Sequence, residues 1–305
     1  MSARDPLAFD RSHFDTERPN PATLALDTLS TAAAFDAINA EDAHVAHAVA
    51  VAKHDIVRAI DLVADRLARG GRLFYVGAGT SGRLGVLDAT ECPPTFQTDP
   101  KMVQGIIAGG ERALTSAVEN AEDSSDNGTH VIRERNVGPL DVVFGIAAGG
   151  TTPFVHAAIR EARSRGAATV FFACVPKDQA PDAADVSIRV ITGPEVVAGS
   201  TRMKAGTATK LVLNTVTTLA MVRLGKVHGN LMVDVNTRGN AKLWQRGIGL
   251  VAKLAQVDRA EAEHLLEAAG GGVKIAVLMR ARSLSRLEAE DKLQRCSGVL
   301  RRALE

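Results

Sequence analysis

Five short apolar runs, separated by longer stretches of helical character, constrain the fold of this chain more than any other feature. They lie at residues 72–76, 102–108, 141–148, 168–175 and 185–192. Runs such as "DVVFGIAA" are apolar at consecutive positions, which is typical of a parallel strand buried on both faces. Strands that alternate with helices predict an α/β fold, a parallel sheet flanked by helices. Right-handed crossovers place the loops after the strands along one edge, where ligands usually bind.

Helical patterns lie on both sides of this predicted sheet in the sequence. Before it, residues 1–22 are interpreted as an extended arm and residues 23–64 as N-terminal helices. Apolar residues from Val45 to Leu67 recur at helical spacing and stop at the cap signal Gly70-Gly71.

A second helical region follows residue 200. Residues 203–226 are apolar nearly all round, which predicts a buried helix. Capping boxes at Asp258-x-x-Glu261 and Ser285-x-x-Glu288 then predict a small C-terminal helical subdomain at residues 245–305.

Composition excludes several classes of protein. The chain has 305 residues and a formal net charge of +1, with no basic block that would indicate nucleic-acid binding. Three widely spaced cysteines do not make a disulfide framework and fit a reducing compartment. No apolar run approaches the roughly 20 residues of a membrane span, and the polar N-terminus has no signal-peptide core. We expect a soluble cytoplasmic protein without a membrane partner.

The first predicted strand leads into "GAGTSG" at residues 77–82, a loop with two interpretations. The pattern fits G-x-G-x-x-G and invites a dinucleotide-binding hypothesis. That fingerprint also needs an acidic residue at the end of the second strand, and Asp99 precedes its strand instead. Hydroxyls and free N–H groups at a helix start suit a phosphate, although a simple capped turn has the same pattern.

Two further loops carry the same chemistry and favour a phosphate. They are "AAGGTTPF" after the third strand and "GSTRMKAGTA" before the buried helix. Neither has the G-x-x-x-x-G-K-[ST] form, which disfavours ATP, so we expect a small phosphorylated molecule. For Arg202 and Lys204, an ion pair at the helix start is an equally good interpretation. The candidate ligand-binding residues are Gly79, Thr80, Ser81, Gly149, Gly150, Thr151, Thr152, Ser200, Thr201 and Lys204.

Several other residues have the chemistry of a site but a plainer explanation. His44, His47 and His54 lie on a predicted helix without the pattern of a zinc motif, and solvated histidines are commoner there. No histidine lies near Cys92 in sequence, so we interpret that cysteine as structural. His228, in "GKVHGN", is a candidate to line the site without an assigned role.

Four segments together resemble one family. "GAGTSGRLGVLDATECPPTF", "IIAGGERAL…AVENAEDS", "EVVAGSTRMKAGTA" and "GKVHGNLMVDV" are similar to the N-acetylmuramic acid 6-phosphate etherases, from about Thr28 to the C-terminus. The "TSGRLG…ECPPT" block is highly specific, and is shared mainly with the glucokinase regulatory protein. The resemblance implies a sugar-isomerase (SIS) domain at residues 65–228, with a flavodoxin-like three-layer sandwich. It also implies a homodimer with sites near the subunit interface, and no metal or redox cofactor.

The resemblance implies an activity and two catalytic carboxylates. The family cleaves the lactyl ether of N-acetylmuramic acid 6-phosphate, giving N-acetylglucosamine 6-phosphate and D-lactate in cell-wall recycling. Its acid maps onto Glu91, and its second carboxylate, the base, onto Glu122. Because proline disfavours helix in its predecessor, we expect the chain to leave its helix at Glu91. An acid acting near neutrality also needs partial burial. Glu119 lies one expected helical turn from Glu122 and is the obvious misassignment.

Two features complicate this mapping. The family's third-strand loop usually reads "ASGRTP", whereas this chain has Gly149 in place of the serine and Thr151 in place of the arginine. If Ser81 opens a helix and Glu91 closes it, they lie about 15 Å apart, which exceeds a sugar phosphate. The helix is then short or bent, or the later loops hold the phosphate, or the partner subunit completes the site.

Two alternative functions remain at this stage. A sugar-phosphate-binding regulator like the glucokinase regulatory protein needs no catalysis, but the retained Glu91 and Glu122 argue against it. An aldose–ketose isomerase on the same domain needs a proton shuttle but not the acid of the ECPPT block.

Overall fold

The computed structural model describes residues 14–305, so the first half of the predicted arm lies outside the described residues. Its centre is a five-stranded parallel sheet of order β2-β1-β3-β4-β5. All five predicted strands are confirmed, with bounds β1 Leu73–Gly77, β2 Val103–Ile107, β3 Val142–Ile146, β4 Ala168–Ala173 and β5 Val186–Arg189. The strands β1, β3 and β4 are buried at every position, as their continuous apolar runs predict.

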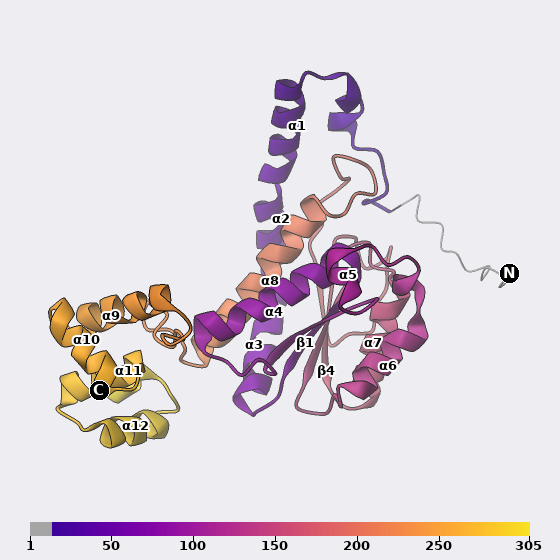
Figure 1. Cartoon of the computed structure of the whole chain (residues 1–305). Helices are drawn as coiled ribbons and strands as arrows, with labels where there is room; N and C mark the ends of the chain where they lie inside the picture. Colours follow the sequence, from indigo (N-terminus) through magenta and orange to yellow (C-terminus); the bar gives the residue numbers. More distant parts are fainter. Residues whose placement is uncertain (1–13) are drawn as a thin grey trace.

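Helices cover both faces of the sheet and make the three layers of the predicted sandwich (Figure 1). Along β1, Leu73 and Tyr75 point into one apolar cluster, whereas Phe74 and Val76 point into the other, because successive side chains alternate between faces. The first face is covered by α3 (Lys53–Ala68), α4 (Gly79–Phe96) and α8 (Lys204–Arg223), and the second by α6 (Ser125–Glu134) and α7 (Pro153–Ser164).

The N-terminal helices continue away from the sheet. The short turns η1 (Pro21–Thr23) and η2 (Leu26–Thr28) precede α1 (Thr31–Ala43), α2 (Val45–Val51) and α3. The single helical pattern predicted from Val45 to Leu67 is interrupted at Ala52. Helix α1 stands out from the body of the molecule (Figure 1), and none of its residues is buried.

Helix α4 differs from prediction in one respect. It continues through Pro93 and Pro94 and ends at Phe96, where Gln97 adopts a left-handed conformation. The prediction that the chain leaves the helix at Glu91 is therefore wrong. Two prolines remove only two N–H donors, and burial of Cys92 and Phe96 in the core keeps the last turn against the sheet.

The C-terminal helices form a separate cluster at one end of the molecule (Figure 1). They are α9 (Ala241–Ala255), α10 (Arg259–Ala268), α11 (Val273–Arg282), α12 (Arg286–Arg295) and α13 (Leu300–Leu304). Both predicted caps form, since Asp258 accepts from the Glu261 N–H and Ser285 and Glu288 make a reciprocal capping box. The Asp234 carboxylate joins this cluster to the preceding segment, because Lys274 and Lys226 both pair with it.

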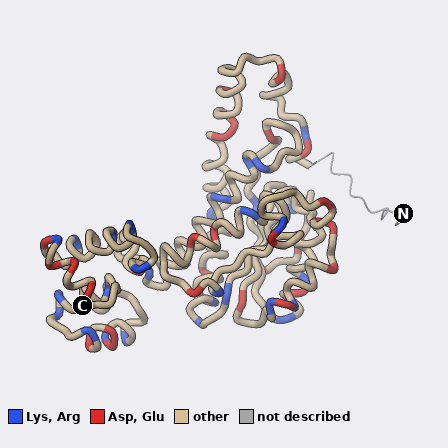
Figure 2. Tube along the Cα trace, in the orientation of Figure 1, with Lys and Arg blue, Asp and Glu red and all other residues tan. Residues whose placement is uncertain are grey.

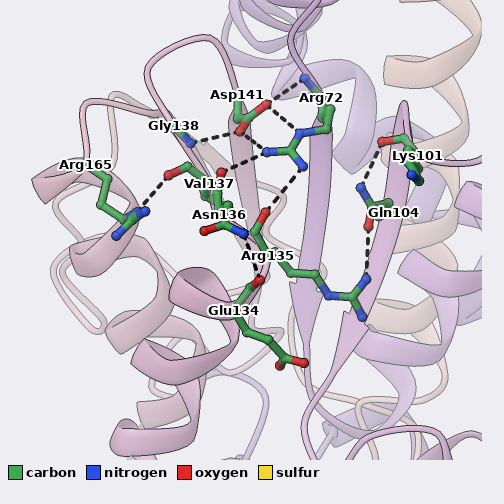
Figure 3. Close-up of polar contacts among 10 residues, drawn as sticks. All are labelled: Arg72, Lys101, Gln104, Glu134, Arg135, Asn136, Val137, Gly138, Asp141 and Arg165. Atoms are coloured by element: carbon green, nitrogen blue, oxygen red, sulfur yellow. Dashed lines mark hydrogen bonds and ion pairs between the residues drawn. The ribbon is translucent and has the colours of Figure 1, made fainter.

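Polar contacts connect the starts of the strands at the amino edge of the sheet (Figure 3). The buried carboxylate of Asp141 accepts from the Arg72 guanidinium at 2.7 Å, and from the backbone N–H groups of Arg72 and Gly138 at 2.9 Å. Arg72 also donates to the carbonyls of Arg135 and Asn136. These contacts fasten the starts of β1 and β3. Charges of both signs are interspersed over the rest of the chain (Figure 2).

Candidate active site

The three predicted ligand-binding loops gather at the opposite, carboxyl edge of the sheet. Each leads into a helix, because α4 begins at Gly79, α7 at Pro153 and α8 at Lys204. Two of the loops meet, since the position of a Cβ on Gly206 lies 3.5 Å from the Thr201 carbonyl oxygen and 3.6 Å from the Thr80 methyl. The first and third loops are therefore in contact.

The loop after β3 is tightly packed at one glycine and open at its neighbour. Gly150 has φ +78°, and a Cβ there would meet the Ala180 Cβ at 2.4 Å, so only glycine fits. A Cβ on Gly149, by contrast, would have one neighbour within 4 Å among residues 14–305 outside its own chain neighbours, the Thr16 hydroxyl. Because Gly149 takes the place of the family's serine, the loop has open space there.

Six hydroxyls at this edge have no partner within residues 14–305. All six are half-buried. They are Thr80, Ser81, Thr151, Thr152, Ser200 and Thr201. Unpaired hydroxyls at the starts of three helices provide donors to an anion, where the helix dipole also favours negative charge.

The predicted base lies beside the first loop. Glu122 lies in the short turn η3 (Ala121–Asp123). Together with Gly79 and Arg83, it lines a cavity of about 190 Å³. The Arg83 guanidinium donates to the Leu114 and Ser116 carbonyls and so holds this segment near α4. Glu119 also lines the cavity, although the segment is not the helix that prediction placed there.

The predicted acid lies elsewhere. Glu91 is exposed on α4, so the expected partial burial is not found within one chain. It is ten residues from Ser81 along a continuous helix, a separation of about 15 Å. The cavity at Glu122 does not include Glu91. The uninterrupted helix excludes a short helix, which is one half of the first explanation offered for this separation.

The predicted ligand lysine is already paired. Lys204 is 3% exposed, and its ammonium lies 2.5 Å from the Glu41 carboxylate. Burial raises the pKa of Glu41, but hydrogen bonds from Lys204 and Asn20 outweigh it and leave that pKa lowered. Of the two interpretations offered for Lys204, the structure has the ion pair at the helix start.

The sequence reasoning missed Glu195. Its carboxylate is fully buried and accepts from the N–H groups of Lys204 and Ala205, at the amino end of α8. Burial raises the pKa of Glu195, against these backbone hydrogen bonds, which favour the anion. Glu195 thus caps α8 from within the chain. Glu195 is the first residue of "EVVAGSTRMKAGTA", so the sequence shows that it precedes α8. No spacing pattern, however, predicts that a residue nine positions before a helix caps that helix.

Cysteine and metal chemistry have little support here. Cys92 is buried, and burial together with the nearby charges of Asp88 and Glu91 raises the pKa of its thiol to about 12, which opposes the reactive thiolate. No group of three or more metal-ligating side chains occurs among residues 14–305. Across the same residues, no helix is both long and apolar enough to cross a membrane.

This fold and its loops define a class. The sheet order β2-β1-β3-β4-β5, with helices on both faces, is that of a flavodoxin-like fold, and the matching family models place it in the SIS-domain class. Residues 111–219 match the SIS domain, and residues 55–163 match the glucokinase regulatory protein N-terminal SIS domain.

Full-length relatives narrow the class. The N-acetylmuramic acid 6-phosphate etherase of Synechocystis sp. is 52% identical over 296 residues, covering 97% of each chain. The protein of the same name from Synechococcus elongatus is 53% identical over 300 residues, covering 98% of this chain and 97% of its own. The chain belongs to the N-acetylmuramic acid 6-phosphate etherase family, and is an enzyme of the lyase type.

Proposed function

We propose that this chain cleaves the D-lactyl ether of N-acetylmuramic acid 6-phosphate, giving N-acetylglucosamine 6-phosphate and D-lactate in peptidoglycan recycling in the cytoplasm. The observation that carries the proposal is full-length similarity to etherases at about half identity, in a chain that retains both carboxylates. A sugar phosphate needs donors for its phosphate, and the unpaired hydroxyls at the carboxyl edge supply them.

Two proton transfers make the chemistry feasible. The ether lies at C3 of a sugar whose C1 becomes an aldehyde when the ring opens, so the C2 hydrogen is acidic. Glu122 removes that proton, and the resulting enolate expels lactate as Glu91 protonates the ether oxygen. Water then adds at C3 of the unsaturated aldehyde, with the proton transfers reversed. Each such group typically contributes about 10²–10⁴-fold in rate.

We also propose that the active form is a homodimer in which Glu91 of one protomer serves the phosphate loops of the other. Within one chain, the ten-residue separation along α4 puts Glu91 about 15 Å from Ser81. An exposed apolar side chain shares the face that carries Glu91, because Leu87, one helical turn away, is 53% exposed. Phe35 on the projecting helix α1 is 65% exposed, and such apolar surface favours a protein partner.

The domain boundaries follow the same proposal. Residues 65–228 form the sugar-phosphate-binding unit, residues 23–64 the N-terminal helices, and residues 245–305 the C-terminal helical unit. The substrate-binding residues are those of the three loops, except that Lys204 acts through its pair with Glu41 and not by direct contact.

One experiment tests this function. The protein is incubated with N-acetylmuramic acid 6-phosphate in deuterated water, and D-lactate and deuterium at C2 of the product are measured. Both are expected. Glu91→Gln should block lactate release while C2 exchange continues, because only the acid is lost. Binding without either product would instead indicate a regulator, and exchange without lactate in the unmodified protein would indicate an isomerase.

A further inference from the structure

A buried hydroxyl without a partner lies between two of the three loops. Thr16 is fully buried, and its Oγ1 makes no hydrogen bond with any of residues 14–305. Its backbone is well anchored, since the Thr16 carbonyl accepts from the Gly199 N–H at 2.9 Å. We call residues 14–20 the N-terminal segment. It crosses the carboxyl edge of the sheet and joins the third loop there.

The Thr16 hydroxyl faces the second loop. Its oxygen lies 3.9 Å from the position of a Cβ on Gly149, and no other atom of residues 14–305, apart from Gly149 and its chain neighbours, lies within 4 Å of that position. A Cβ at that position would be in ordinary van der Waals contact with the hydroxyl, so the gap between Thr16 and the loop that leads into α7 is about the size of a methyl group. The hydroxyls of Thr151 and Thr152 in that loop are also without partners among residues 14–305.

A neighbouring threonine shows that pairing is available nearby. The Thr23 hydroxyl is also buried, and it donates to the Val196 carbonyl at 2.8 Å. Burying a hydroxyl without a partner opposes folding, and a valine of the same shape would avoid that cost. Thr16 lies beside Gly149 of the second loop, so a ligand bound there would give its hydroxyl a hydrogen-bond partner.

We propose that Thr16 is a substrate-binding residue whose hydroxyl donates to a phosphate oxygen of the ligand at the amino end of α7. This inference rests on the proposed function. The phosphate oxygen occupies the space beside Gly149, where the family usually carries a serine side chain. Because the hydroxyl is enclosed in the ligand-free chain, binding includes a small outward shift of the N-terminal segment.

The test measures affinity for the product. Thr16→Val removes the hydroxyl and keeps the shape, Thr16→Ser keeps the hydroxyl, and N-acetylglucosamine 6-phosphate is titrated calorimetrically. We expect Thr16→Val to weaken binding about tenfold, the effect of losing one hydrogen bond to a charged oxygen. Thr16→Ser should remain within about threefold of the unmodified protein. Without ligand, Thr16→Val should melt no lower than the unmodified protein, because it loses no hydrogen bond.

A matched control separates binding from general effects. Thr98 is also buried, with a hydroxyl that has no partner in residues 14–305, but it follows α4 at the other edge of the sheet. Thr98→Val should leave affinity unchanged. The inference is overturned if Thr16→Val binds product as tightly as Thr98→Val, or if the unmodified protein binds no product. Product binding that depends on Thr16 in a protein that releases no lactate would sustain the inference and overturn the proposed function.

Discussion

The two edges of the sheet differ in how completely their polar groups are hydrogen-bonded. At the amino edge, Asp141 accepts four hydrogen bonds, two from the Arg72 side chain and two from backbone N–H groups (Figure 3). At the carboxyl edge, hydroxyls such as Ser81 and Thr151 have no partner within residues 14–305. Both edges carry polar residues, so polarity alone does not distinguish them. What marks the edge that is built for a ligand is a group of such hydroxyls on three neighbouring loops, since the amino edge has a single one, that of Thr98, among residues 14–305.

The prediction with the largest expected effect tests whether a second chain completes the site at the carboxyl edge of the sheet. Glu91→Gln and Glu122→Gln should each reduce lactate release by about 10²–10⁴-fold. Co-expressed, the two variants should recover about a quarter of the unmodified activity. This follows because half of randomly paired dimers are mixed, and each mixed dimer holds one intact site of two. Lactate release by the purified mixture is the measurement.

A second mixture controls this experiment. The double variant Glu91→Gln/Glu122→Gln, paired with the unmodified chain, should give mixed dimers without an intact site. If the two single variants recover no activity together although dimers form, both carboxylates act within one chain and the shared-site proposal fails.

A prediction of intermediate size tests whether the hydrogen bonds at the amino edge of the sheet serve stability. Asp141→Ala should lower the free energy of unfolding by about 3 kcal/mol, because it leaves the Arg72 guanidinium and two backbone N–H groups without their acceptor. Urea unfolding measures the loss. The KM for substrate should stay unchanged wherever the variant is folded. An altered KM with little loss of stability would contradict the division of roles between the two edges.

The smallest effect concerns Asp88, which lies between the edges on α4. Burial raises its pKa, although Asn214, Tyr75 and Thr217 favour the anion, and one of its oxygens has no partner within residues 14–305. A carboxyl whose pKa is higher in the folded chain contributes stability below its unfolded pKa of about 3.9, and that contribution is lost as pH rises through the folded value.

Asp88→Asn should therefore be more stable than the unmodified protein at pH 7. It should also show a flatter dependence of stability on pH above 4, measured by urea unfolding. Equal pH dependence in the two proteins would mean that Asp88 does not titrate abnormally.

The sequence predicts the elements of the fold better than the surroundings of its site. Buried parallel strands need continuous apolar runs, and the caps at Asp258 and Ser285 need particular side chains at fixed spacing, so both are visible locally. The end of α4 cannot be predicted from the local sequence, because core packing of Cys92 and Phe96 outweighs the local effect of two prolines. Glu195 and Thr16 reach the loops through tertiary contacts that leave no spacing signature.

The C-terminal helices carry an apolar core of their own, which includes Ile248, Val251, Leu266 and Val277. We therefore expect each chain to contain two cooperative units, the sheet with its helices and the C-terminal cluster. Heating should melt these units in separate calorimetric transitions, and a single melting temperature would then describe neither.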